Sequence, residues 1–376
     1  MLNIIENKSS FSNDELVKMV RRENNSKRNY LLVDSKQGKH IPADPSDVIR
    51  LFTELGSQIK EVVKNEKVLF IGFAETATAV GVGVASCFPD SYYLHTTREV
   101  NTAKEPVVEF KEEHSHAVEQ LLYCDEWESI SSDVDRIVFV EDEITTGKTI
   151  MNFIDVLVSG KKVKDSIRFS ACSILNGMTP ERKAELKKQG VDFYFLVNMS
   201  ASPESQEVYS YDIPDPEVVL SAVYDTVELK GYTDPRYGVR TDRYISECDK
   251  LADEVMRSFD FTGKKIAVVG TEECMYPAIL TARKIKENTS AKDVLTHSTT
   301  RSPILADDCD EYPLKTRFRV ESLYEDGRKT FIYNSRVNSY DMVLFVTDSE
   351  KEKICIDRLI NAFSESKKFV LVRWGK

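Results

Sequence analysis

The stretch Arg136-Ile-Val-Phe-Val-Glu-Asp-Glu-Ile-Thr-Thr-Gly-Lys-Thr-Ile150 indicates the fold class of this chain. Four apolar residues are followed directly by two acids, Glu141 and Asp142, and then by a short Thr/Gly loop and a helical pattern. In parallel sheets ligands bind at the carboxyl ends of strands, and a helix N-terminus there presents unpaired N–H groups to a phosphate. The stretch therefore predicts an α/β fold with a mainly parallel sheet and an anion site at the end of this strand.

The loop after the acids carries donors suited to a phosphate. Thr145, Thr146 and Thr149 offer hydroxyl groups, and Gly147 lets the backbone approach a ligand closely. The two acids before the loop are suited to accept hydrogen bonds from sugar hydroxyls or to face a hydrated Mg²⁺. Together these parts predict a ribose-phosphate site.

Two other interpretations of the stretch rank lower. Gly147-Lys148-Thr149 matches the end of the nucleotide triphosphate loop Gly-x-x-x-x-Gly-Lys-Ser/Thr, but that loop requires glycine five residues earlier, where Asp142 stands. A strand that merely ends in an acidic turn before a capped helix accounts for Thr146 and Gly147. It does not account for two acids placed directly after four apolar residues.

Composition describes a soluble globular protein. The chain has 376 residues, 41% apolar and 30% charged, which suits two domains of about 188 residues each. Its 51 basic and 62 acidic residues give a net charge of −11, which opposes nonspecific binding to nucleic acid or to an anionic membrane. No apolar run approaches a bilayer span and the start lacks a signal peptide, so we expect a cytoplasmic protein. The seven cysteines are scattered, which favours reduced thiols over disulfides or zinc.

Strand-length apolar runs alternate with amphipathic segments from end to end, which favours two α/β lobes. The Pro- and Ser-rich stretch 201–216 reads as a linker, so we place the domains at 1–214 and 215–376. Expected strands cover 30–34, 67–73, 92–97, 136–140, 166–175, 192–197, 265–270, 294–297, 317–323, 329–333, 342–347 and 368–374. Expected helices cover 45–64, 76–87, 148–158, 180–188, 242–258, 276–286 and 351–363.

The opening stretch resembles the phosphoribosyl pyrophosphate (PRPP) motif of type I phosphoribosyltransferases: an apolar run, two acids, two or three residues, then Thr-Gly-x-Thr. One departure is Glu141, where the first acid is commonly aspartate. The resemblance implies that Glu141 and Asp142 bind the ribose hydroxyls, act in catalysis and face Mg²⁺. It also implies that the loop from Thr145 to Thr149, Lys148 included, cradles the 5′-phosphate.

The segment Phe70-Ile-Gly-Phe-Ala-Glu-Thr-Ala-Thr-Ala79 follows a strand and opens a helix, where this family binds pyrophosphate through backbone amides. By that resemblance Gly72 and Ala74 keep the approach to the loop open, and Thr76 is a further candidate for binding there. Ordinary packing of small residues between a helix and a sheet is the alternative. Glu75 heads the helix and is expected to cap it or to hold water on Mg²⁺.

A strand that ends in Arg98 precedes a polar stretch, and in the family a mobile lid follows this strand and brings cations to the pyrophosphate. Arg98 is the first candidate because its planar fork of donors suits phosphate. Lys104 and Lys111 are secondary candidates. His114 and His116 would steady the leaving pyrophosphate or move a proton on such a lid, or they are ordinary surface residues.

A narrower resemblance rests on the combination Gly38-Lys-His-Ile-Pro42, Gly72-Phe-Ala-Glu-Thr-Ala77, His95-Thr-Thr-Arg-Glu99, His114-Ser-His-Ala117 and Thr300-Arg-Ser-Pro303. This combination resembles phosphoribosyltransferase-like proteins with a TRSP domain, which are typical of bacterial tellurium-resistance and stress gene clusters. The resemblance covers most of the chain. It implies synthesis of a nucleoside-like metabolite.

The second half repeats landmarks of the first. Gly72 and Glu75 return as Gly270 and Glu273 at an offset of 198, and Thr96-Thr97-Arg98 returns as Thr299-Thr300-Arg301 at 203. Asp142 returns as Asp348, without a phosphate loop after it. We hypothesise a degenerate phosphoribosyltransferase-like lobe, with generic α/β similarity as the alternative. The second-lobe candidates are Glu273, Arg301, Ser302 and Asp348, which would line a second anion or substrate site or support an interface.

The resemblance implies a Mg²⁺-dependent phosphoribosyltransferase that moves ribose 5-phosphate between PRPP and a base-like or amine acceptor. In the family a variable hood holds the acceptor, here residues 1–45 or the stretch around 192–211. A non-catalytic PRPP or nucleotide sensor, or an interaction module of a stress-response assembly, remains an alternative. Expected partners are PRPP and the acceptor, with a second copy of the chain or stress-operon proteins as candidates, and neither nucleic acid nor a membrane.

Overall fold

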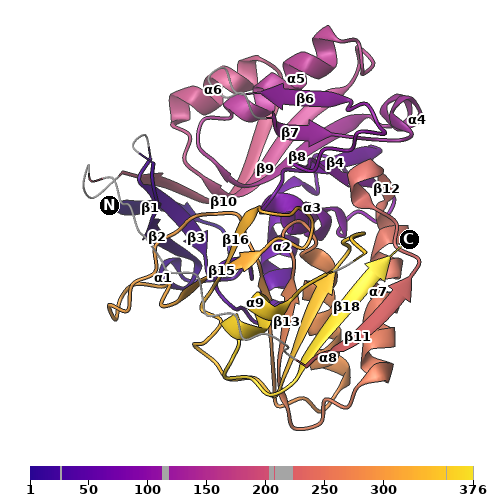
Figure 1. The fold of residues 1–376 in the computed structure, drawn as a ribbon. Coiled ribbons are helices and arrows are strands. Elements are labelled where there is room, and N and C mark those ends of the chain that lie inside the picture. Colours follow the sequence, from indigo (N-terminus) through magenta and orange to yellow (C-terminus); the bar gives the residue numbers. More distant parts are fainter. Residues whose placement is uncertain (26–27, 112–117, 203–206, 208–222, 353, 376) are drawn as a thin grey trace.

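The computed structural model describes the whole chain except residues 26–27, 112–117, 203–206, 208–222, 353 and 376. Two α/β lobes lie one above the other in Figure 1, the first in indigo to magenta and the second in orange to yellow. Within the described residues no helix combines the length and the apolar character needed to cross a membrane. The expected linker at 201–216 and the expected domain boundary fall largely outside the described residues.

The first lobe is built on a seven-stranded sheet whose five central strands are parallel (Figure 1). Each edge is closed by an antiparallel strand, one from the N-terminus and one from the segment that enters the second lobe. In spatial order the strands are β1 (Leu2–Asn7), β10 (Val191–Ala201), β9 (Arg168–Asn176), β8 (Arg136–Ile144), β4 (Val68–Gly72), β5 (Tyr92–His95) and β12 (Val239–Arg240).

The second lobe has a five-stranded sheet in which all strands are parallel. In spatial order they are β11 (Asp225–Lys230), β18 (Phe369–Gly375), β17 (Met342–Thr347), β13 (Lys265–Gly270) and β14 (Asp293–Ser298). The order β18-β17-β13-β14 repeats the order β9-β8-β4-β5 of the first sheet. Counted along the chain, the strands that the two sheets share are β4, β5, β8 and β9 in the first lobe and β13, β14, β17 and β18 in the second. Each lobe also has an antiparallel hairpin before the third of these strands. The hairpins are β6 (Val108–Lys111) with β7 (Val118–Leu122), and β15 (Arg317–Glu321) with β16 (Lys329–Tyr333). This agreement supports the hypothesis of two related lobes.

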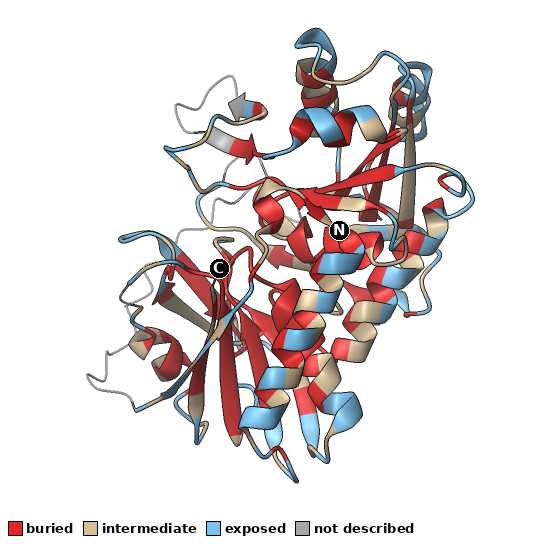
Figure 2. Ribbon diagram, turned by 90° about the vertical axis from the view of Figure 1, so that its right-hand side faces the viewer, coloured by how far each residue is buried: buried red, intermediate tan, exposed pale blue. Residues whose placement is uncertain are grey.

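Helices cover both sheets, and Figure 2 shows buried strands beneath helices with exposed outer faces. Two helices pack on one face of the first sheet and two on one face of the second, and the apolar residues of all four form one continuous cluster. These helices are α2 (Pro45–Ile59), α3 (Ala77–Ala85), α7 (Thr241–Ser258) and α8 (Tyr276–Asn288). The helices α2 and α7 each bury one apolar stripe, whereas every residue of α3 is buried. On the opposite faces lie α4 (Trp127–Asp133), α5 (Lys148–Ser159) and α9 (Asp357–Ala362), and α6 (Pro180–Lys188) packs on β10.

The expected helix over 351–363 is shorter in the structure, since α9 begins only at Asp357. The backbone before it is held in another conformation: Arg373 donates to the Lys351 carbonyl oxygen at 2.8 Å. The remaining expected elements all occur, some with the expected ends, as for α6, β13 and β17, and others with shifted ends. Six further strands and two α-helices were not expected within the described residues: β1, β2 (Val17–Arg21), β6, β7, β11 and β12, and α1 (Asn13–Leu16) and α4.

A hood stands over the carboxyl ends of the first sheet. It comprises α1 (Asn13–Leu16), the antiparallel strands β2 (Val17–Arg21) and β3 (Tyr30–Asp34), and the turn up to residue 44. Val20 and Val33 of the hood pack against Phe331 and Tyr333 of the second lobe. Both lobes therefore contribute to the cover of the first sheet.

Candidate active site

The loop between β8 and α5 joins a sheet strand to a helix, which is the order of elements that the sequence predicts. Gly147 caps α5 with a φ of +69°, in the left-handed region that favours glycine, and a Cβ there would lie 2.8 Å from Leu186 Cδ1. Thr145, Thr146 and Lys148 are exposed and Thr149 is half-buried. The loop side chains are therefore accessible at the start of a helix, and within the loop the Lys148 amide donates to Thr146 Oγ1 at 3.3 Å.

Arg182, on α6, supports this loop and was not anticipated from the sequence. Its Nε donates to the Thr146 carbonyl oxygen at 3.0 Å. The Thr179 hydroxyl caps α6 by accepting from the Arg182 backbone amide at 3.2 Å, which fixes the position of the arginine. The only sequence signal near Arg182 is the Thr-Pro pair that starts a helix. This pair predicts the helix but not the contact between Arg182 and the loop.

Glu141 and Asp142 lie at the end of β8, as predicted, and both are half-buried. Burial raises the pKa of Asp142 to about 6, and the charge of Glu143 adds to the rise. Burial, Asp142 and Glu143 raise the pKa of Glu141 well above its usual range, against the opposing charge of Arg98. A cation or hydroxyl donors brought to these carboxylates would relieve their repulsion.

Arginines gather beside the acids. Arg28 Nη2 donates to Glu143 Oε1 at 2.7 Å. The Arg98 side chain is exposed, and its charge lowers the pKa of Glu141 against the larger effect of burial. Burial and the charges of Arg28 and Arg98 lower the pKa of the half-buried Arg22. The two hood arginines were missed, because nothing in their local sequence indicates the sheet edge that they face.

Asp34, the last residue of β3, extends the acidic group into the hood. It is 4% exposed, and its Oδ1 accepts from the Lys36 backbone amide at 2.7 Å. Its Oδ2 has no hydrogen-bond partner among the described residues. Burial raises its pKa to about 7, and the charge of Asp142 adds to the rise. A strand over 30–34 was expected, but a role for its terminal acid was not.

The predicted pyrophosphate loop after β4 is more enclosed than expected. A Cβ on Gly72 would lie 2.7 Å from the Ala77 carbonyl oxygen, so close packing requires this glycine. The Ala74 amide donates to Thr96 Oγ1 at 2.8 Å. Thr76 begins α3 without a side-chain capping bond. The close approach of Gly72 to Ala77 agrees with ordinary packing of small residues between a helix and a sheet, which is the alternative to pyrophosphate binding that the sequence leaves open.

Glu75 is held from two sides. Its carboxylate pairs with Lys39, a fully buried lysine of the hood, and with Arg301 Nε of the second lobe at 2.9 Å. Burial raises the pKa of Glu75, but Lys39 and Arg301 outweigh it and lower the pKa overall. The carboxylate therefore binds cations of the protein and makes no capping bond to the start of α3.

The second-lobe candidates lie at the contact between the lobes. Glu273 is bound by Arg236 Nε at 3.1 Å and by Arg301 Nη2 at 2.9 Å. Asp348, at the end of β17, accepts from Arg236 Nη1 at 2.7 Å and from two tyrosine hydroxyls, and has no ion pair with Arg301. Ser302 donates its backbone amide to Thr300 Oγ1 at 3.1 Å. These contacts favour the interface role over a second anion site.

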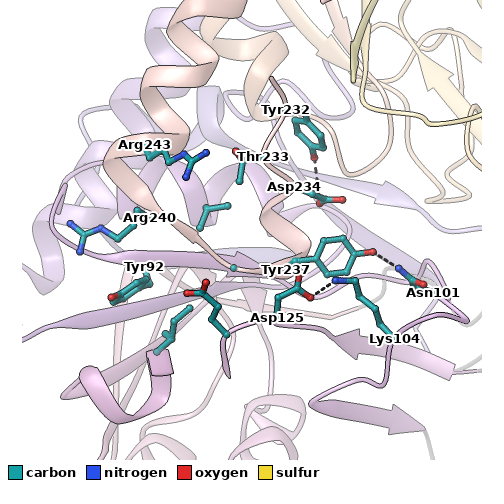
Figure 3. Close-up of a pocket in the computed structure, with 14 residues that line it drawn as sticks. Tyr92, Asn101, Lys104, Asp125, Tyr232, Thr233, Asp234, Tyr237, Arg240 and Arg243 are labelled. Atoms are coloured by element: carbon teal, nitrogen blue, oxygen red, sulfur yellow. Dashed lines mark hydrogen bonds and ion pairs between the residues drawn. The ribbon is translucent and has the colours of Figure 1, made fainter. Parts of the chain in front are cut away.

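A cavity of about 550 Å³ lies where β5 meets the segment 232–243 (Figure 3). Its polar groups largely pair with one another: Lys104 with Asp125, and Asn101 Nδ2 with Tyr237 Oη at 2.7 Å. Its lining includes none of the predicted phosphate-loop or acid residues. Lys104, a secondary lid candidate, thus lies at this cavity. His114, His116 and the Lys111 side chain lie outside the described residues.

Two family models match the two lobes, the first of which carries β8, the acid pair and the loop before α5. The family described as phosphoribosyl transferase matches residues 16–202, and the TRSP domain that follows it in such proteins matches residues 233–363. The chain belongs to this phosphoribosyl transferase family with a C-terminal TRSP domain, which confirms the resemblance drawn from the motifs.

Solved structures with the transferase fold match about half of the chain. Orotate phosphoribosyltransferase from Aeropyrum pernix is 16% identical, with a TM-score of 0.29, over 49% of this chain and 89% of that one. Adenine phosphoribosyltransferase from Leishmania tarentolae is 15% identical, with a TM-score of 0.34, over 53% and 94%. UMP synthase from Leishmania donovani is 17% identical, with a TM-score of 0.29, over 49% of this chain but only 34% of that one. No curated protein matches the chain.

Proposed function

We propose that the protein transfers ribose 5-phosphate between PRPP and a base-like or amine acceptor in a Mg²⁺-dependent reaction. The observation that carries this proposal is the acid pair Glu141 and Asp142 at the end of β8, directly before a loop in which left-handed Gly147 begins α5. The loop would hold the 5′-phosphate through its amides and hydroxyls. The acids would accept hydrogen bonds from the ribose hydroxyls.

The donor set also fits a hydrated magnesium ion. Glu141 and Asp142 are oxygen ligands with raised pKa values, so each would gain from a nearby cation. Among the described residues no group of three or more ligating side chains surrounds a metal position. Substrate and water would have to supply the remaining ligands. When bound, Mg²⁺ would supply positive charge to the pyrophosphate.

The residues of the chain would then stabilise charge as the bond between C1 and pyrophosphate breaks. Positive charge develops on the ribose, next to the two carboxylates, and the leaving pyrophosphate gains negative charge. Arg98 is exposed, and its charge acts on Glu141, so it would meet that negative charge with a planar fork of donors. The hood, with Asp34 and Arg22, would face the acceptor.

The pathway is proposed on the family resemblance alone. A nucleotide-like metabolite made in a cytoplasmic stress or tellurium-resistance response is the expected product. One structural observation favours the alternative of a PRPP or nucleotide sensor: in the pyrophosphate loop the Ala74 amide and the Glu75 carboxylate are both bound by other groups of the chain. A sensor would bind PRPP without releasing pyrophosphate.

Asp142→Asn tests the proposal. The protein is incubated with Mg²⁺, PRPP and a panel of bases and amines, and pyrophosphate is followed. We expect the variant to keep its fold and to lose roughly 100-fold or more of the pyrophosphate release. Asp155→Asn, the same change at an exposed position on α5, is the matched control and should behave as the wild type. Unchanged turnover in Asp142→Asn would refute the proposal, and PRPP binding without turnover in the wild type would favour the sensor.

A further inference from the structure

The segment Thr300-Arg301-Ser302-Pro303, called the TRSP segment here, follows β14 and is fixed by the β15–β16 hairpin. Thr300 and Phe331 exchange two backbone hydrogen bonds, of 2.9 and 2.7 Å. The Ser302 carbonyl oxygen accepts from Tyr333 Oη at 2.6 Å. The segment is therefore a rigid support on the second lobe.

From this support Arg301 reaches the pyrophosphate loop of the first lobe. Its backbone amide donates to both carboxylate oxygens of Glu75, at 3.3 and 3.2 Å, and its Nε lies 2.9 Å from Oε2. Glu75 is 9% exposed and Arg301 is 12% exposed at the side chain. A buried carboxylate that accepts from a backbone amide and forms an ion pair with the guanidinium has little freedom, so the loop that carries it is held in place.

The same guanidinium binds three further acids. Nε lies 3.1 Å from Glu272, and Nη2 lies 2.9 Å from Glu273 and 3.5 Å from Glu99. Glu99 follows Arg98 directly, so one side chain connects the pyrophosphate loop with the start of the lid segment. A lysine, with a single nitrogen, could not make these contacts at once.

The contact is reciprocal between the lobes. Glu75 stands three residues after Gly72 and binds the backbone amide of Arg301. Glu273 stands three residues after Gly270 and binds the backbone amide of Arg98 at 3.2 Å and Thr97 Oγ1 at 2.7 Å. The acid after β4 thus holds the segment after β14, and the acid after β13 holds the segment after β5.

We propose that Arg301 is a positioning residue: the TRSP segment uses it to hold Glu75, and thereby the backbone of the loop that binds pyrophosphate. The inference rests on the proposed function. On this view the second lobe completes the transferase site by supporting one half of it. The phosphate loop between β8 and α5 is supported separately, by Arg182.

That separation makes the role measurable on the full-length protein. Isothermal titration calorimetry would follow the binding of pyrophosphate with Mg²⁺, of ribose 5-phosphate and of PRPP. The variants are Arg301→Lys, Arg301→Gln and Glu75→Gln. The matched control is Lys286→Gln, which breaks another ion pair between the lobes, with Asp44 at the start of α2.

We expect Arg301→Lys to weaken pyrophosphate and PRPP binding by about ten- to a hundredfold, because a displaced loop loses its contacts. Ribose 5-phosphate affinity should stay within about twofold, and Lys286→Gln should leave all three affinities unchanged. Arg301→Lys combined with Glu75→Gln should bind pyrophosphate no more weakly than Glu75→Gln alone.

Two results would overturn the inference: pyrophosphate affinity unchanged in Arg301→Lys, or an equal loss for ribose 5-phosphate together with a lower melting temperature. The second result would mean that Arg301 only holds the lobes together. If Arg301→Gln fails to fold, the pyrophosphate affinities of Arg301→Lys and Glu75→Gln decide whether the inference holds. Wild-type protein that binds no PRPP would instead refute the proposed function, and the inference with it.

Discussion

Replacing Asp34 by asparagine should stabilise the protein at pH 8 and flatten its dependence of stability on pH. The Asp34 carboxyl is buried in the hood, and one of its oxygens has no partner among the described residues. Burial, with the charge of Asp142 in addition, raises its pKa from 3.8 to about 7. Asparagine resembles the protonated form, and it can still accept the hydrogen bond from the Lys36 amide.

The sign and size follow from linkage. A group whose pKa is higher in the folded state contributes stability that is full below its unfolded pKa and is lost as pH rises through its folded pKa. A rise from 3.8 to about 7 corresponds to about 4 kcal/mol at most. Between pH 5 and pH 8 the wild type should lose about 2–3 kcal/mol of unfolding free energy through Asp34, and the variant should not.

Urea denaturation of both proteins at pH 5, 6, 7 and 8 measures this difference. Asp44→Asn is the control, because Asp44 caps α2 through Ser46 and pairs with Lys286. Burial raises the pKa of Asp44, but these contacts outweigh it and lower the pKa overall. The contribution of Asp44 to the free energy of unfolding is therefore lost only at acidic pH. Its variant should differ from the wild type by a constant amount over this range. An Asp34→Asn difference that is also independent of pH would refute the reasoning.

Two further substitutions test the phosphate loop and the second lobe. Gly147→Ala should weaken PRPP binding by about tenfold or more in calorimetry, because a left-handed non-glycine residue costs about 1–2 kcal/mol and its Cβ would press on Leu186; wild-type affinity would contradict a tight loop. Asp348→Asn should lower the free energy of unfolding in urea by about 3–5 kcal/mol, because it leaves Arg236 without its closest buried counter-charge. A loss below about 1 kcal/mol would show that this pair contributes little.

The transferase fold was predictable because its signals are local. The apolar run before Glu141, the glycine at 147 and the helix pattern after it lie within fifteen residues, and each follows from sheet burial or helix geometry. The positions of Glu141 and Asp142 at the end of β8 were predicted for the same reason. Arg98 was chosen for the donor fork of its guanidinium and for its place before the lid of the family, and its charge lowers the pKa of Glu141; its role stays a prediction.

The contacts that close the site could not be predicted, because they join distant parts of the chain. Arg301 and Glu75 are 226 residues apart, and Lys39 and Glu75 meet only through the turn of the hood. Expectations about Glu75 therefore stopped at capping or metal binding. The repeated landmarks did indicate two lobes of the same strand order. They did not indicate that Glu75 and Glu273 each accept a hydrogen bond from the backbone of the other lobe.

The apolar cluster shared by α2, α3, α7 and α8 has a consequence for dissecting the protein. Phe52 and Val84 belong to the first lobe, Ile279 and Leu280 to the second, and all four lie in one uninterrupted core. Cutting the chain between the lobes would expose this surface on both fragments to water. The two lobes should therefore melt in a single cooperative transition, and a transferase fragment expressed alone should aggregate rather than report the activity of the whole.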